Sequence, residues 1–413
     1  MNMSMSHHLS GLTRVGDHHR RELKKPRQFF KWMLGSDPQP SDAQVEELKR
    51  YLLMGDRLAD AVVAMYRDLP TGQGRKLLDQ ALEQGIDSLE EPPQALVDLF
   101  AQIDEEPIWL DRDKIKLGCD VSRRVGVSGE LVLRNLSLMA GYLGSAAAKP
   151  LVFTGQLDRM TPRRLVETGK FWFDVTTPGG LERNGEGFKS AIRVRMMHAQ
   201  VRNMLLNSNK WKMEWGHPLN QADTMATTLE FSIIFMLGLR AIGFIINRRE
   251  REAVIHLWRY IGYLMGVEER ILPADEADAL RALYLMTATA GGPDEDSRAL
   301  GVSLANVPLQ EAGDKWYSQA LAKAEYHLRV GYTRYILGDK AADILGLPAN
   351  KMKYFWMAQF PLRFGSELVR ATVQPVNRFV LKLNNKLAEK QFPERVSKTQ
   401  ADTSFTPVNQ LAR

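Results

Sequence analysis

Apolar residues recur three and four positions apart along most of this chain, which is the period of an amphipathic helix. The first such window spans residues 41–68, where Ser41 or Asp42 is suited to the N-cap and the turn residues DLPTG end the run. Strict alternation is almost absent and no strand–helix repeat occurs, so the sequence predicts an all-α fold. Further helical windows lie at residues 74–85, 93–102, 112–124, 128–148, 162–175, 188–207, 224–246, 247–267, 314–337 and 353–387.

The residues that punctuate these windows predict where the helices begin and where the chain loops. Thr161 and Pro162 are suited to the cap and the first turn of one helix. Asn220 or Asp223 is suited to capping another. Residues 291–314, GGPDEDSRALGVSLANVPLQEAGD, break the helical pattern and are long enough to predict a functional loop.

Two windows, residues 135–148 and 224–246, are apolar on nearly every side, as helices buried within protein are. The second is interrupted by Glu230 and Arg240, which leave an uncharged run of about nine residues against the roughly 20 that span a bilayer. We therefore expect no transmembrane helix and a thick helical core.

The formal net charge is +6, and much of the excess lies near the N-terminus in HHRRELKKPRQFFKWMLG. A solvated tail is favoured over an arm that binds nucleic acid or a membrane surface, and no nucleic-acid partner is expected. The twin arginines there are not followed by the long apolar stretch of an export signal. We expect a basic, poorly ordered tail (1–40), a helical extension (41–110), a main helical domain (111–387) and a disordered tail (388–413).

Cys119 is the only cysteine, so no internal disulfide can form. This usage fits a reducing compartment, which predicts a cytoplasmic location. No Cys-x-x-Cys pair exists, which argues against a thiolate zinc site, and Cys119 is expected to be a small core residue.

One helical window carries an unusual strip of side chains in the sequence RVRMMHAQVR. Arg195, His198 and Arg202 lie at positions i, i+3 and i+7, on one side of the helix and next to its apolar stripe. A neutral imidazole can bind a metal and two guanidinium groups can bind anions, and haem offers both an iron and two propionates. The alternative is a histidine at the border of the core, with both arginines paired to carboxylates of a neighbouring helix. Spacing alone favours this alternative.

The preceding helical window, RRLVETGKFWFDV, places Arg164 and Thr168 on one face, with Glu167 beside them. An arginine, a hydroxyl and a carboxylate near a ligand-binding iron can steer and protonate dioxygen. The alternative is an Arg164–Glu167 ion pair within the first turns of the helix, and the segment alone favours that alternative.

Taken together, RRLVETGKFWFDVTTPGG, GFKSAIRVRMMHAQVR and WGHPLNQADTMATTLEFSIIFMLGLRAIG resemble the rubber oxygenase (latex-clearing protein) and MpaB-type oxygenase family. The resemblance covers roughly residues 110–340. It implies a globin-like helical core that holds haem b, with additional flanking helices, and oxidative cleavage of isoprenoid double bonds by dioxygen. It also implies His198 as the iron ligand, Arg164 and Thr168 as pocket residues, and Arg195 and Arg202 as propionate partners.

The sequence departs from the family pattern in the expected distal region. Rubber oxygenases carry a lysine where this chain has Glu167, so the resemblance implies an open or water-filled distal side. No match to a distal glutamate occurs in GYLGSAAAKP, and Glu167 is the candidate substitute. The lack of an export signal argues against polyisoprene outside the cell as the substrate.

The leading hypothesis is a cytoplasmic, haem b-dependent oxygenase, with or without peripheral membrane contact, that uses dioxygen on a hydrophobic small-molecule or polyprenyl alkene and has Arg164, Glu167 and Thr168 in the pocket. The alternatives are a helical protein that carries haem or lipid without turnover and a plain helical scaffold. The C-terminal window, residues 353–387, mixes aromatic and basic residues. It can lie on an anionic membrane surface, although docking on the body is favoured from sequence.

Overall fold

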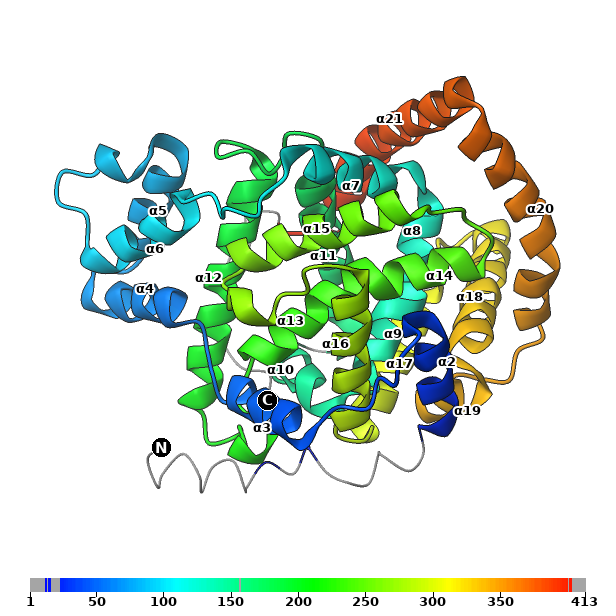
Figure 1. Ribbon diagram of the computed structural model, residues 1–413, viewed down its shortest axis with the longest axis horizontal. Coiled ribbons are helices and arrows are strands. Elements are labelled where there is room, and N and C mark those ends of the chain that lie inside the picture. The colour runs from blue at the N-terminus through cyan, green and yellow to red at the C-terminus, as the bar shows by residue number, and fades with distance from the viewer. Residues whose placement is uncertain (1–11, 13, 16–22, 156, 400, 403–413) are drawn as a thin grey trace.

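The computed structural model describes residues 12, 14–15, 23–155, 157–399 and 401–402, and these residues form helices and turns without a β-strand (Figure 1). The all-α prediction is confirmed, whereas the globin-like detail of the core stays a prediction. Most helices have an amphipathic or wholly apolar pattern, so each is stabilised chiefly by packing against its neighbours. The helices outside the two long apolar windows are α2 (Lys24–Leu34), α3 (Asp42–Leu52), α4 (Arg57–Asp68), α5 (Gln73–Gln84), α6 (Gln94–Asp104), α7 (Arg112–Arg124), α11 (Leu157–Thr176), α12 (Glu186–Leu206), α15 (Arg248–Leu264), α16 (Glu276–Thr289), α17 (Glu295–Gln310), α18 (Trp316–Leu337), α19 (Asp339–Ile344), α20 (Lys353–Thr372) and α21 (Gln374–Thr399), with 3₁₀ turns at Ile86–Ser88, Met213–Trp215 and Glu269–Ile271.

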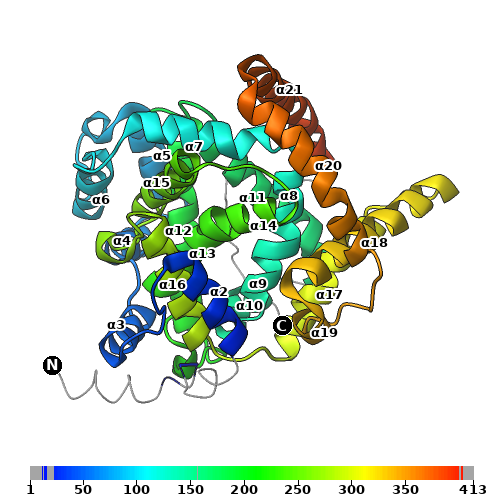
Figure 2. The same cartoon turned by 45° about the vertical axis from the view of Figure 1, so that its right-hand side comes forward.

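Helices α11 and α12 pack side by side near the middle of the molecule, and α7 packs along α15 (Figures 1 and 2). Helices α4, α5 and α6 form a group at one side, where α4 packs against α12. Helices α20 and α21 run along the opposite outer edge (Figure 1). The main core lies between these layers, and a second cluster fills the space among α9, α10, α17 and α18.

The two apolar windows are the least regular helices of the core. The first comprises α8 (Val127–Val132), a π-helix η3 (Leu133–Leu138), α9 (Met139–Tyr142) and α10 (Ser145–Thr154), with a bend of 106° before α10. The second comprises α13 (Gln221–Leu229), a π-helix η5 (Glu230–Ile234) and α14 (Phe235–Ala241).

Gln221–Ala241 is long and apolar enough to cross a membrane, and the bent segment passes the same test only when its two halves are counted together. Of the apolar part of Gln221–Ala241, 61% is buried inside the protein, as in a core helix. This is weak evidence for a membrane span, and the packing agrees with the core role predicted from sequence.

Two helix predictions need correction. The window 41–68 forms two helices, α3 and α4, because the chain turns at residues 53–56; Ser41 caps α3 as predicted, in a capping box with Gln44. Residues 291–314 are not a loop, because Asp294 caps α17 in a second capping box and the helix runs through Pro308 to Gln310.

The start of α11 and both predicted tails also differ from the structure. Helix α11 begins at Leu157, so Pro162 lies inside it and Thr161 is not its cap. Within the predicted tail 1–40, residues Lys24–Leu34 form α2, whose Phe30 is buried against the ring of Tyr284. At the other end, α21 continues to Thr399, beyond the predicted start of a disordered tail. The remaining tail predictions, for residues 1–11, 13, 16–22, 400 and 403–413, lie outside the described residues.

Candidate functional site

His198 lies in the middle of α12 and is half-buried. Burial and, to a smaller extent, the neighbouring Arg202 charge lower the pKa of this imidazole to about 4, against the opposing effect of Asp56. The ring is therefore neutral at pH 7, which is the form that binds a metal. No hydrogen-bond partner for either ring nitrogen is found among the described residues.

Two properties of His198 together describe its surroundings. The side chain keeps accessible surface, yet its pKa is shifted as strongly as that of a group enclosed by protein. Burial of most of the ring disfavours the charged imidazolium. The ring nitrogens thus have no described partner in a poorly hydrated part of the fold.

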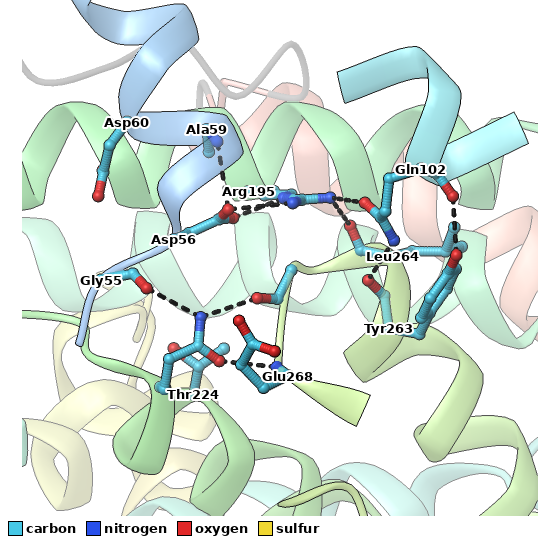
Figure 3. A network of polar contacts seen from close by, with 12 residues as sticks. Gly55, Asp56, Ala59, Asp60, Gln102, Arg195, Thr224, Tyr263, Leu264 and Glu268 are labelled. Carbon is cyan, nitrogen blue, oxygen red and sulfur yellow. Dashed lines mark hydrogen bonds and ion pairs between the residues drawn. The ribbon is translucent and has the colours of Figure 1, made fainter. Parts of the chain in front are cut away.

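Arg195, one turn before His198, is buried and its hydrogen bonds are made within the protein. Its Nε and Nη2 donate to the two carboxylate oxygens of Asp56 at 2.5 and 3.0 Å, and its Nη1 donates to Gln102 Oε1 at 2.7 Å (Figure 3). Nη1 also donates to the carbonyl of Leu264 at 3.2 Å. Asp56 is the N-cap of α4, so this pair joins α12 to the start of α4.

Arg202, one turn after His198, is held in the same way. Its Nη2 and Nε donate to Asp60 at 2.6 and 2.9 Å, and its Nη1 donates to the carbonyl of Leu219 at 2.8 Å. Both arginines are thus paired with carboxylates of the neighbouring helix α4, as in the alternative weighed from sequence. These contacts give no support to the predicted role of Arg195 and Arg202 as propionate partners.

Arg164, on α11, is directed at α10. Its Nη1 donates to the carbonyl of Leu151 at 2.9 Å and its Nη2 donates to Thr154 Oγ1 at 2.7 Å. Gly155 allows this approach, because a Cβ there would lie 2.8 Å from the guanidinium carbon. Burial lowers the pKa of Arg164, which shows that the guanidinium lies in a poorly hydrated part of the fold.

The other two predicted pocket residues are arranged differently. Glu167 accepts a hydrogen bond from Nε of Arg163 at 2.8 Å, so the internal pair weighed from sequence forms with Arg163 and not with Arg164. The backbone N–H of Asp402 also donates to Glu167, at 2.9 Å. Thr168 is exposed, and its hydroxyl has no hydrogen-bond partner among the described residues. The structure therefore does not bring the three predicted groups together.

Glu230 is a half-buried, desolvated acid that the sequence reasoning missed as a functional residue. It is the first residue of η5, and its carboxyl group lies against Gly141, where any Cβ would collide with Oε1. Burial, together with the charge of Asp223, raises the pKa of Glu230 to about 8. No hydrogen-bond partner for this carboxyl group is found in the described part of the chain. Like His198, it is half-buried and strongly desolvated.

Tyr142 interacts electrostatically with both Glu230 and Arg164. Burial raises the pKa of this phenol, the nearby Glu230 carboxyl group raises it further, and the Arg164 charge opposes them. The three side chains therefore lie close enough to interact electrostatically, and they come from η5, α9 and α11. The only sequence signal for this cluster was a single acid in an otherwise apolar window, beside the small residues of GYLG.

Side-chain hydroxyl groups donate to one backbone carbonyl group in each π-helix, and one of these carbonyls belongs to Glu230. A π-turn leaves a carbonyl without its usual helical partner, so another donor must satisfy it. Ser137 Oγ, from η3, donates to the carbonyl of Glu230 at 2.7 Å, and Thr333 Oγ1 donates to the carbonyl of Asn135 at 2.8 Å. Single π-turns are frequent at functional sites, which agrees with a specific role for this position.

The donor set decides which kind of metal centre is compatible with these residues. Among the described residues, no group of three or more His, Cys, Asp and Glu side chains is placed to hold a metal ion. A haem iron needs only one ligand from the protein, because the porphyrin nitrogens supply the equatorial ligands. A single neutral imidazole therefore fits a haem better than a bare metal ion.

The fold and the site together define a helical protein with a neutral, desolvated imidazole at His198 and a separate half-buried acid at Glu230. The family model described as "ER-bound oxygenase mpaB/B'/Rubber oxygenase, catalytic domain" matches residues 123–371, more than half of the chain. The chain belongs to this family, and the resemblance inferred from sequence is confirmed.

The chain is also similar to two known proteins. The chain is 25% identical over 279 residues to the "Rubber oxygenase" of Streptomyces sp. (strain K30), a match that covers 65% of this chain and 63% of that protein. It thus spans less than two thirds of that relative. A solved structure of latex clearing protein in the closed state has the same fold, with a TM-score of 0.57, 21% identity, and coverage of 80% of this chain and 90% of that one.

Proposed function

We propose that the protein is a haem b-dependent oxygenase that uses dioxygen to oxidise or cleave an alkene in a hydrophobic, polyprenyl-type substrate. The observation that carries this proposal is His198, a largely desolvated, neutral imidazole whose ring nitrogens have no described partner, within the part of the chain that matches the oxygenase family. The similarity to a protein named rubber oxygenase supports an isoprenoid substrate class. The single cysteine, which is buried, supports the cytoplasm as the location.

In this proposal the residues around His198 position it. His198 would hold the haem through a ring nitrogen, and the haem, when bound, would supply a redox-active iron that activates dioxygen. Arg195 and Arg202 hold the two turns on either side of His198 against α4 through Asp56 and Asp60. Both guanidinium groups are buried, so these two ion pairs restrict the orientation of α12 around the imidazole.

The proton-handling group in this proposal is Glu230, in place of Glu167. A carboxyl group that stays protonated at pH 7 can donate a hydrogen bond or a proton to a reacting oxygen atom. Tyr142 interacts electrostatically with this acid and with Arg164, and Arg164 fixes α10 to α11. Glu167 is engaged by Arg163 and Asp402, so its carboxylate is less available for this task. Thr168, with an unpaired hydroxyl, remains a proposed pocket residue.

The test is an absorption spectrum and an oxygen-uptake assay on protein expressed with ample haem. We expect a Soret band and oxygen uptake with a polyprenyl alkene, and we expect His198→Ala to lose both. The matched control is His327→Ala, because His327 is an exposed histidine on α18 and its loss should leave pigment and uptake unchanged.

Two results would contradict the proposal in different ways. A His198→Ala variant that keeps its Soret band and its oxygen uptake would exclude His198 as the ligand. A pigmented parent protein with no oxygen uptake on any polyprenyl alkene would favour a haem carrier without turnover.

A further inference from the structure

Helix α20 presents its apolar side chains outward and its charged side chains inward. Leu362 is 79% exposed, and Tyr354, Met357 and Leu368 are each more than half exposed. On the inner face, Glu367 and Arg370 are buried as an ion pair. This is the reverse of the pattern expected for a surface helix of a globular protein, so the outer face calls for an apolar or amphipathic environment.

The outer face of α20 carries no charge along its length. Between residues 354 and 377, every charged side chain is buried or half-buried, and none belongs to the exposed class. The stretch without a charged side chain of the exposed class is thus about as long as the whole helix. Its exposed large apolar side chains are Tyr354, Phe355, Met357, Leu362, Phe364, Leu368, Val369 and Val373.

Helix α21 continues this surface with two parallel rows of side chains. The exposed apolar row contains Phe379, Leu383 and Leu387, which recur every four residues. The row beside it contains Arg378, Lys382 and Lys386, which are also exposed, and none of these three forms an ion pair with another described residue. An apolar row flanked by unpaired basic residues is typical of helices that lie in a membrane interface.

We propose that the α20–α21 arm, residues 353–390, docks on the surface of a bilayer that contains anionic phospholipids. The arm runs along the outer edge of the molecule, with α20 in orange and α21 in red (Figure 1), so a flat surface can reach it. The apolar side chains of α20 enter the interface, and the basic row of α21 pairs with lipid phosphates. The proposal is independent of the oxygenase activity, although a polyprenyl substrate would be dissolved in such a bilayer.

Charge decides between a bilayer and a second copy of this chain as the occupant. In a two-fold contact the same patch meets itself, so the basic row of one arm would lie near the basic row of the other. Their mutual repulsion opposes such a dimer, whereas an anionic surface neutralises the row. The arm therefore fits a lipid surface better than it fits itself.

The experiment is co-sedimentation of the full chain with vesicles of phosphatidylcholine, with and without phosphatidylglycerol. Two double variants test the surface: Leu362→Glu with Leu368→Glu on α20, and Lys382→Glu with Lys386→Glu on α21. The matched controls are Ile108→Glu, at an exposed apolar position outside the arm, and Lys76→Glu, at an exposed basic position on α5. All four target positions on the arm are exposed, so the variants should fold.

We expect the parent and both controls to sediment with the anionic vesicles and to be released by high salt. Each basic residue lost from α21 should weaken binding to the anionic vesicles about fivefold. The Leu362→Glu, Leu368→Glu variant should lose binding to both vesicle types, because it removes the apolar contact. Equal sedimentation of the parent and of both arm variants would overturn the proposal. So would a dimer of the parent without lipid, detected by light scattering, that dissociates in the Leu362→Glu, Leu368→Glu variant. Sedimentation requires neither haem nor turnover, so its failure is distinguishable from failure of the proposed activity.

Discussion

At the scale of single residues, the acid at position 230 is the most informative departure from an apolar core. A carboxyl group without a hydrogen-bond partner is costly to bury, and a protein reduces that cost by keeping the group protonated. The ordinary pKa of a glutamate side chain is 4.5, and that of Glu230 in the fold is raised to about 8. Between these two pH values the folded protein keeps a proton that the unfolded chain releases. The buried acid therefore lowers stability as the pH rises from about 4.5 to about 8.

Replacing this acid with its neutral isostere tests that account. We expect Glu230→Gln to match the parent at low pH and to become more stable than the parent, by a few kcal/mol, as the pH rises to about 8. The measurement is the free energy of urea unfolding at a series of pH values. Glu90→Gln, at an exposed position, should follow the parent throughout. If the difference between the parent and Glu230→Gln is independent of pH, Glu230 is not a protonated acid in the fold.

Residue spacing predicted the strip of Arg195, His198 and Arg202 correctly, because helical period alone determines which side chains share a side of a helix. It did not identify their partners. Asp56 lies 139 positions from Arg195 and Asp60 lies 142 positions from Arg202, so only tertiary packing brings them together. Glu230 was missed for the same reason, since its environment is made by residues of other helices.

At the scale of helices, the position of α12 depends on two ion pairs of unequal burial. The Arg195 and Asp56 side chains are 3% and 9% exposed, whereas Asp60, the partner of Arg202, is 40% exposed. A buried charge that loses its partner cannot be compensated by water, but a partly exposed one can. The contact at Asp56 should therefore contribute more to the attachment of α12 to α4.

We expect Asp56→Asn to lower the free energy of unfolding by about 3 to 5 kcal/mol, because it leaves the Arg195 guanidinium buried without its counter-charge. Asparagine still caps α4, so the change isolates the ion pair from the N-cap. Asp60→Asn should cost less, about 1 to 2 kcal/mol, because water replaces part of the interaction. Urea unfolding of both variants at pH 7 measures the two losses of unfolding free energy. Equal losses, or a larger loss in Asp60→Asn, would contradict the greater contribution of the Asp56 contact.

Helix prediction from sequence succeeded where the apolar period was long and failed where local chemistry misled it. The glycine, proline and acidic residues of GGPDEDS suggested a loop, but Asp294 and Ser297 form a capping box and begin α17. The π-turns η3 and η5 have no sequence signature, because an inserted residue is tolerated only where a donor such as Ser137 from another helix satisfies the displaced carbonyl.

At the scale of the whole molecule, the arm is joined to the body by polar contacts as well as apolar ones. Arg370 donates to Glu367, to Asn377 Oδ1 at 2.8 Å and to the carbonyl of Ile245 at 2.8 Å. Further along, Asn384 donates to the carbonyl of Arg124 at 2.5 Å. A polar attachment leaves the apolar side chains of α20 facing outward, which is the arrangement that an interfacial surface requires.

The contacts of Arg370 therefore predict that the arm can be loosened without unfolding the body. Arg370→Ala leaves Glu367 buried without its partner and frees Asn377, so the junction between α20 and α21 at Val373 should open. We expect thermolysin to cleave within residues 372–379 roughly tenfold faster or more, with a small change in the Tm of the body. The matched control is Ser366→Ala, an exposed position on the same helix, which should be cleaved at the parent's rate. A large fall in Tm with unchanged cleavage at the junction would mean that the arm and the body unfold as one cooperative unit, because local opening would then require global unfolding.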